Sequence, residues 1–257
     1  MISYQLSDDE MATQLFAILL ISLCACAAWA SEDEKKLLTK LFENYDTRVR
    51  PVLENSDKLT VEVGVTLRKL IKVNPVANTV EAIAWIVQKW QDYQLRWDPT
   101  HYGGINKVQV PQTDVFKTDL VLYNSAKAMY KEHRQQPNKV MIMSDGLVVI
   151  VDSVKLTADC PINDTATEIT CPIILGSWVY DMSQIDLKPG TFTTDPDVIA
   201  SPMWTVTGMK GKRVEKYFPK WELSYVSVNI DVNLSKNKND MDVDKSHEEA
   251  NVNANDL

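Results

Sequence analysis

The sequence of 257 residues has only three histidines, four cysteines and no glycine-rich phosphate-binding loop. His101, His133 and His247 are scattered, so we expect no metal, no cofactor and no enzymatic activity. The formal net charge of −8 argues against nucleic acid as a partner, since phosphate contacts need a basic surface. No apolar run after Ala30 reaches the ~18 residues typical of a transmembrane helix, so we expect no membrane span there.

The first 30 residues have the pattern of a removable leader. Residues 15–29 are apolar but too few for a confident membrane span. Ala28-Trp29-Ala30, followed directly by charged residues, is typical of a signal-peptide cleavage site, so we expect a secreted, extracellular protein. Acidic residues at positions 8–10 are unusual in a signal peptide and fit better with translation from Met11. The alternative interpretation of the apolar run is an N-terminal membrane anchor.

Removal of the leader would leave two cysteines, Cys160 and Cys171. In a secreted chain they most simply form one disulfide. Two sequons, at Asn163 and Asn233, are available for N-glycosylation. Residues 235–257 contain no aromatic residue and few apolar ones, which predicts a disordered acidic tail. The folded domain is therefore expected over residues 31–234.

The middle of the chain predicts one short helix followed by strands. Ser31 and Glu34 have the spacing of a capping box, and apolar residues follow at helical spacing. After Pro51 the apolar period changes to two, as in residues 59–67 and 226–234, and the sequence 144–146 (Ser-Asp-Gly) predicts a hairpin. The predicted fold is all-β, an immunoglobulin-like antiparallel β-sandwich with a short N-terminal α-helix.

In two predicted strands a tryptophan lies in the row of side chains that is otherwise polar. In residues 80–97 one row contains Ile83, Trp85 and Val87 and predicts the core face, which puts Trp90 on the polar face. In the last strand the even positions predict the core face, so Trp221 shares its row with polar residues. A tryptophan in such surroundings often marks an interface or a ligand wall, although it also covers the edges of ordinary cores.

Several motifs in this sequence occur together in a known family. Residues 85–97 have the spacing W-x4-W-x-D-x2-L-x-W, and they are followed by Tyr102-Gly-Gly104, Gly176-Ser-Trp178 and Trp204-x-Val-x-Gly. In order and spacing, over roughly residues 33–234, the chain resembles the extracellular ligand-binding domain of nicotinic-type Cys-loop receptors. It is most similar to the soluble acetylcholine-binding proteins of that family.

The resemblance implies a ring-shaped homopentamer that binds a small amine or an amphiphilic ligand between neighbouring copies. A cation inside an aromatic box gains ~2 kcal/mol or more per well-placed desolvated ring. The principal face implied by the resemblance consists of Tyr123, Trp178, Tyr217 and Trp221, and the implied complementary face consists of Trp90, Met141, Val149 and Val151.

The sequence also departs from the family pattern at the expected site. Residues 216–221 form a short segment without the adjacent cysteine pair of acetylcholine-binding subunits, and Val149 is apolar. These departures predict a more open and more apolar site. Three hypotheses follow. The first is a secreted pentamer that binds a small cationic ligand and has no channel of its own. The second is a relative that binds a bulkier or non-cholinergic amphiphile, and the third is a structural pentamer without a ligand.

Overall fold

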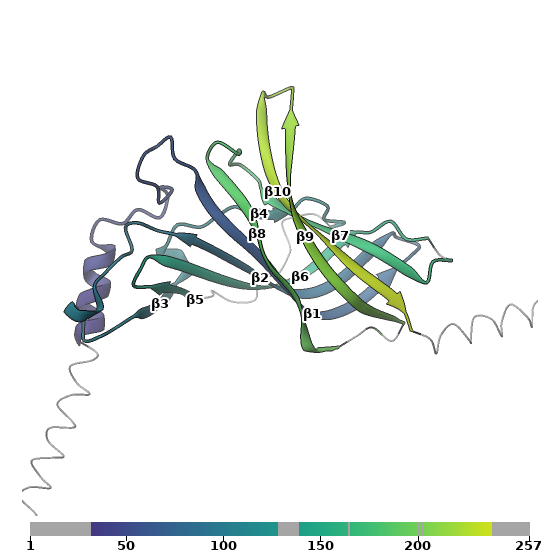
Figure 1. Cartoon of the computed structure of the whole chain (residues 1–257), viewed down its shortest axis with the longest axis horizontal. Helices are drawn as coiled ribbons and strands as arrows, with labels where there is room; N and C mark the ends of the chain where they lie inside the picture. The colour runs from purple at the N-terminus through teal and green to yellow at the C-terminus, as the bar shows by residue number, and fades with distance from the viewer. Residues whose placement is uncertain (1–31, 128–138, 164, 200, 202, 238–257) are drawn as a thin grey trace, which may run out of the picture.

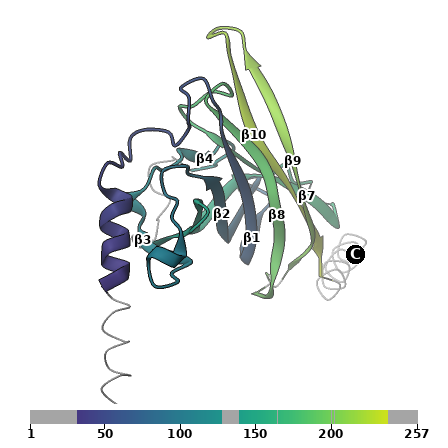
Figure 2. The same cartoon turned by 60° about the vertical axis from the view of Figure 1, so that its left-hand side comes forward.

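The structure, a computed structural model, describes residues 32–127, 139–163, 165–199, 201 and 203–237. The predicted leader, His133, His247 and residues 238–257 lie outside this part. A helix over residues 32–42 precedes the strands and packs on the core through Leu37 and Leu41. It lies at the end of the molecule next to β3 (Figures 1 and 2). Within the described ranges, no helix has the length and apolar character needed to cross a membrane.

The strands form two sheets. Two short 3-10 helices, η1 (Pro99–His101) and η2 (Gln112–Asp114), lie before and after β3 in the sequence. β1 and β8 pair in parallel, whereas the other paired strands are antiparallel. The six-stranded sheet has the order β3 (Lys107–Pro111), β5 (Lys139–Met143), β6 (Leu147–Asp159), β2 (Thr79–Gln91), β1 (Leu59–Asn74), β8 (Ile185–Ile199). The four-stranded sheet has the order β4 (Leu120–Leu122), β7 (Glu168–Ser177), β10 (Leu223–Lys236), β9 (Trp204–Phe218).

Alternation along the strands builds the core between the sheets. In β10 all the even residues from Val226 to Leu234 are buried, which confirms the predicted core face of the last strand. The predicted hairpin also forms, because β5 and β6 pair across Gly146, whose φ of 87° is readily adopted only by glycine. The predicted β-sandwich with an N-terminal helix is therefore confirmed.

Strand β2 buries the row of side chains opposite to the one predicted. Trp90 is only 2% exposed, whereas Trp85 is 38% exposed, so the assignment of Trp90 to the polar face is wrong. The register with β6 sets this outcome, since Trp90 is opposite Val148 and Gln88 is opposite Ile150, and both partners point into the core. The neighbouring strand thus decides the face of β2.

The polar residues of the buried row have hydrogen-bond partners. The Gln88 amide oxygen accepts from the Thr118 hydroxyl, and the Asp92 carboxylate accepts from the Tyr45 hydroxyl at 2.6 Å. Burial raises the pKa of the Asp92 carboxyl, with its hydrogen bonds acting in the opposite direction. Because hydrogen-bonded polar groups lose little on burial, Gln88 and Asp92 fit on the core face.

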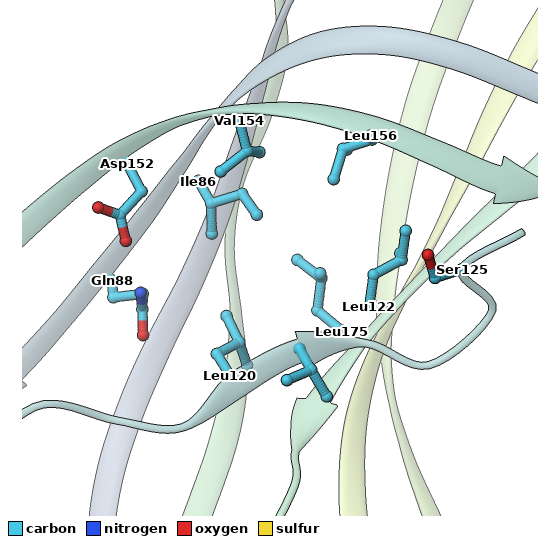
Figure 3. A pocket seen from close by; sticks show the side chains of 10 residues that line it. Ile86, Gln88, Leu120, Leu122, Ser125, Asp152, Val154, Leu156 and Leu175 are labelled. Atoms are coloured by element: carbon cyan, nitrogen blue, oxygen red, sulfur yellow. The ribbon is translucent and has the colours of Figure 1, made fainter. Parts of the chain in front are cut away.

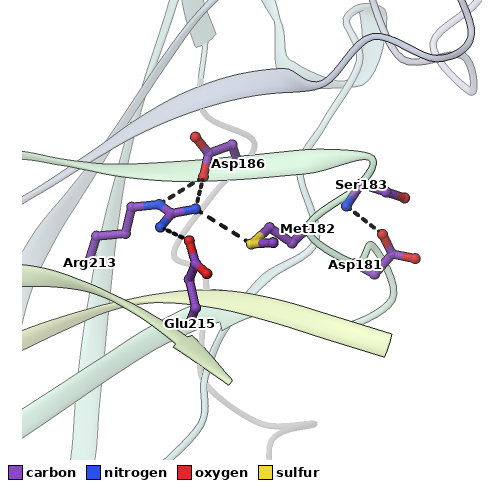
Figure 4. Close-up of polar contacts among 6 residues, drawn as sticks. All are labelled: Asp181, Met182, Ser183, Asp186, Arg213 and Glu215. Atoms are coloured by element: carbon purple, nitrogen blue, oxygen red, sulfur yellow. Dashed lines mark hydrogen bonds and ion pairs between the residues drawn. The ribbon is translucent and has the colours of Figure 1, made fainter. Parts of the chain in front are cut away.

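Two cross-links join the sheets. The disulfide between Cys160 and Cys171 connects the end of β6 to β7, which confirms the predicted pairing. Arg213 in β9 reaches Asp186 in β8, with its Nε and Nη2 donating to Asp186 Oδ1 at 2.9 and 2.8 Å, and Nη1 donates to Glu215 (Figure 4). These acidic partners raise the pKa of Arg213, chiefly through the hydrogen bond to Glu215. The base of the β9–β10 hairpin is thereby fixed to the larger sheet.

The structure shows the surroundings of both sequons and the end of the last strand. Asn163 is exposed, and its side-chain oxygen accepts from the N–H and the hydroxyl of Thr165, at 3.2 and 3.0 Å. Asn233 is exposed in β10. That strand continues to Lys236, two residues beyond the predicted end of the folded domain at Leu234.

Candidate ligand-binding site

Asp119 fixes the turn that carries Trp178 after the end of β7. Its carboxylate accepts from the Ser177 hydroxyl at 2.6 Å and from the backbone N–H of Val179. The Trp178 N–H donates to the backbone oxygen of Asp119 at 3.3 Å, and the Tyr180 N–H donates to the Ser177 hydroxyl at 2.9 Å. The turn is therefore held in place while more than half of the Trp178 side chain stays exposed.

The Tyr123 ring packs against Gly176 in β7. A Cβ atom at position 176 would overlap the Cε2 and Cζ atoms of Tyr123, so the ring needs glycine there. The Tyr123 hydroxyl donates to the backbone oxygen of Ser177. Burial raises the pKa of Tyr123 to about 12, with smaller contributions from Asp119 and Tyr225. Tyr123 is therefore a neutral phenol at physiological pH, and its exposed fraction is 38%.

The β9–β10 hairpin carries a second aromatic group and projects beyond the body of the sandwich (Figures 1 and 2). The ring of Phe218 lies 6.0 Å from that of Trp221 and 5.5 Å from that of Tyr225, within the usual range of aromatic pairs. Tyr217 belongs to the opposite row of β9. Phe218 and Tyr225 are not among the site residues predicted from the sequence. The run of aromatic residues in 217–221 could have indicated Phe218.

The four residues predicted for the principal face lie at or near the ends of strands of the four-stranded sheet. Trp178 follows the last residue of β7, and Tyr123 follows its antiparallel neighbour β4. Tyr217 is next to last in β9, and Trp221 lies in the turn before β10. In the strand order β4-β7-β10-β9, β4 and β9 are the two edge strands, so Tyr123 and Tyr217 lie on opposite sides of β7 and β10. Their role in binding stays a prediction.

Three of the four residues predicted for the complementary face lie on the outer face of the six-stranded sheet. Met141 in β5 is opposite Val149 in β6, and Val151 follows in the same row. Trp85 lies on this face too, since Val87, two positions along β2, is opposite Val151. One chain thus carries two separate groups of exposed apolar and aromatic side chains, one on each sheet.

Trp90 does not belong to either group. Its ring packs edge-to-face on Phe116, with centroids 6.4 Å apart, inside the core. The indole N–H of Trp90 has no hydrogen-bond partner among the described residues. The exposed tryptophan of β2 is Trp85, the first residue of the W-x4-W motif. The sequence did contain one indication that the even row of β2 is the buried one, because that row includes the small apolar residues Ala82 and Ala84.

Basic side chains lie over the exposed rings of both groups. The Lys216 ammonium is 4.9 Å from the centroid of Phe218, and the Lys220 ammonium is 5.6 Å from that of Trp221. On the six-stranded sheet, the guanidinium of Arg68 is 4.2 Å from the centroid of Trp85. These distances are within the ~6 Å range of cation–π attraction.

A separate cavity of about 130 Å³ lies between the two sheets. Figure 3 shows Gln88 and Asp152 close together at one end, with leucine side chains of β4, β6 and β7 around the rest. The Gln112 amide nitrogen lies 3.5 Å from Asp152 Oδ1. No residue predicted for the ligand site lines this cavity, so it is distinct from the exposed aromatic groups.

Comparisons with known proteins show which family this chain is similar to. Residues 34–238 match the family model of the neurotransmitter-gated ion-channel ligand binding domain. The chain is 32% identical over 217 residues to acetylcholine receptor subunit alpha-like 2 of Drosophila melanogaster, which covers 79% of this chain and 37% of that protein. It is 35% identical over 178 residues to acetylcholine receptor subunit alpha-1-A of Xenopus laevis, covering 68% of this chain and 38% of that protein. The chain belongs to the neurotransmitter-gated ion-channel ligand-binding domain family.

A human relative extends the same relationship. Neuronal acetylcholine receptor subunit alpha-3 of Homo sapiens is 34% identical over 177 residues, covering 68% of this chain and 34% of that protein. This ligand-binding domain thus spans little more than a third of the length of these curated relatives. The predicted resemblance to a Cys-loop receptor extracellular domain is confirmed, and the family consists of ligand-gated receptors rather than enzymes.

Proposed function

We propose that this domain is an extracellular, non-enzymatic binding protein that resembles the acetylcholine-binding proteins. It assembles as a homopentamer and binds a small amine at the interface between copies, without a channel of its own. We include in the proposal that residues 1–30 are a signal peptide and that Asn163 and Asn233 carry glycans.

The separation of the two exposed groups carries this proposal. Tyr123, Trp178 and the hairpin aromatics lie at or near the strand ends of one sheet, whereas Trp85 and Val151 lie on the outer face of the other. A single chain leaves each group open to solvent, so a second copy is needed to close a site around a ligand. Large aromatic side chains exposed together are typical of such interfaces.

The chemistry of the first group fits a protonated or quaternary amine. Trp178 and Trp221 present more than half of their surface, and Tyr123 stays neutral, so these rings offer π faces to a cation. Each such contact contributes about 0.5–1 kcal/mol when exposed and ~2 kcal/mol when a second copy excludes water. The Asp119 hydrogen bonds support this role, because they hold the Trp178 turn before the ligand arrives.

A specific observation favours a second candidate, a bulkier or non-cholinergic amphiphile. Lys216, Lys220 and Arg68 already lie over exposed rings of the two groups, and each repels another cation. An amphiphile with a neutral apolar part would use the same aromatic surface without that repulsion.

Titration of the purified protein with acetylcholine, nicotine and serotonin, followed by tryptophan fluorescence, tests the proposal. We expect saturable quenching that Trp178→Ala abolishes and that Val179→Ala, a change at the exposed neighbouring residue, preserves. Binding of a bulky amphiphile without any response to amines would favour the second candidate. No response to either class would leave a structural pentamer.

Light scattering coupled to size exclusion tests the assembly. A pentameric mass at micromolar concentration is expected. A monomeric mass would contradict every form of the proposal that needs a second copy to complete the site.

A further inference from the structure

Three neighbouring strands of the six-stranded sheet hold a chain of charged and aromatic side chains on their outer face. Arg68 in β1 lies between Asp195 in β8 and Trp85 in β2. Its guanidinium forms an ion pair with the Asp195 carboxylate, and its central carbon is 4.2 Å from the centroid of the Trp85 ring. The arginine thus covers a face of the only tryptophan that β2 exposes.

A β-bulge interrupts both ladders of β1 at Arg68. The ladder with β2 shifts register between Leu67 and Lys69, and the ladder with β8 shifts between the same two residues. Arg68 therefore has no register partner in either ladder. Arg68 still belongs to the outward row of β1 that contains Thr66, and the bulge changes the local twist of the strand at this point. Thr66, two residues earlier in this row, is directly opposite Trp85, so the Arg68 side chain is within reach of the ring.

The ion pair keeps the guanidinium over the ring. The Asp195 side chain is only 12% exposed, and the Arg68 side chain is 36% exposed, so water competes weakly for the carboxylate. A planar guanidinium is able to bond a carboxylate at its edge while its face stacks on an aromatic ring. The arrangement is a built-in cation–π contact.

We propose that Arg68 is a specificity-determining residue that competes with cationic ligands for the Trp85 ring. This inference rests on the proposed site between copies, in which Trp85 lies on the same face as Met141, Val149 and Val151. A quaternary ammonium ligand gains the Trp85 contact only by displacing the arginine and is repelled by its charge. A ligand with a neutral group at this position meets neither cost. The site therefore selects against quaternary ammonium groups on the Trp85 side.

Isothermal titration of the full-length protein with acetylcholine and with tetramethylammonium tests the inference, together with Arg68→Gln. We expect Arg68→Gln to raise the affinity for both cations by about two- to fivefold, the factor that one cation–π contact at a partly exposed site is worth. The matched control is Arg48→Gln, which removes an arginine paired with Asp46 in the segment after the helix. That control should leave both affinities unchanged.

A double-mutant cycle separates competition for the ring from a general structural effect. In a Trp85→Leu background, Arg68→Gln should no longer raise the affinity, because no ring remains to be released. Circular dichroism and the oligomeric mass check that each variant is folded.

The outcomes distinguish this inference from the proposed function. Two results overturn the role of Arg68 and leave the amine site standing. One is equal affinity of the wild type and Arg68→Gln for the cations, and the other is a gain in affinity from Arg68→Gln that persists in the Trp85→Leu background. Binding by Arg68→Gln alone supports the inference. Absence of amine binding in every variant, Arg68→Gln included, overturns both.

Discussion

Replacement of Gly176 by alanine should displace Tyr123 from the candidate site. The Cβ of alanine would overlap two ring carbons of Tyr123 and lie 2.7 Å from its hydroxyl oxygen, whereas Cβ contacts below 3.0 Å essentially never occur. The backbone N–H of Tyr123 is fixed to Ile174 O at 2.7 Å, so the ring rather than the strand must move.

The structure sets the size of the two expected effects. Forcing extra volume against a packed side chain costs about 1–3 kcal/mol of unfolding free energy. Loss of the Tyr123 π face should weaken amine binding by about two- to fivefold, the value of one partly exposed cation–π contact. Urea denaturation gives the first quantity, and calorimetric titration with acetylcholine gives the second.

Gly208 in β9 offers a matched control. Its Cβ would meet only the side-chain nitrogen of Asn233, at 3.8 Å, an ordinary contact. Gly208→Ala should therefore keep both stability and affinity, or raise stability slightly by restricting the unfolded chain. In a Tyr123→Ala background, Gly176→Ala should lose most of its cost. If Gly176→Ala and Gly208→Ala have equal denaturation midpoints and equal affinities, the argument for a glycine-dependent position of Tyr123 is refuted.

Two further substitutions test what stabilises the fold around the candidate site. Replacing Cys160 and Cys171 by serine should lower the unfolding free energy by about 3 kcal/mol, because the disulfide closes a loop with a sequence separation of 11; an unchanged urea midpoint would contradict this. Burial raises the pKa of Asp92, so the stability from its protonated form is complete below the unfolded pKa of ~3.9 and is lost as pH rises through the raised folded pKa. Asp92→Asn, which does not titrate, should show a urea midpoint that changes less than that of the wild type as pH rises above the unfolded pKa of ~3.9, and an equally steep decline in both proteins would argue against a raised pKa of Asp92.

The sequence alone determined the features that depend on local order. The spacing of apolar residues set the strand content, as in β10, whose even row is buried as predicted. Cys160 and Cys171, the two cysteines left after the predicted leader, formed the predicted disulfide. The ordered motifs around Trp85 and Trp178 were sufficient to predict the family, which the match over residues 34–238 confirms.

The tertiary structure alone decided which side of β2 faces the core. Both rows of that strand contain apolar residues, and a tryptophan occurs in each, so alternation does not choose between them. The choice came from the register with β6 and from distant partners such as Thr118 and Tyr45, which allow Gln88 and Asp92 to be buried. The bulge at Arg68, beside Trp85, has the same origin. It is a shift between paired strands, and pairing depends on contacts that no single segment of sequence contains.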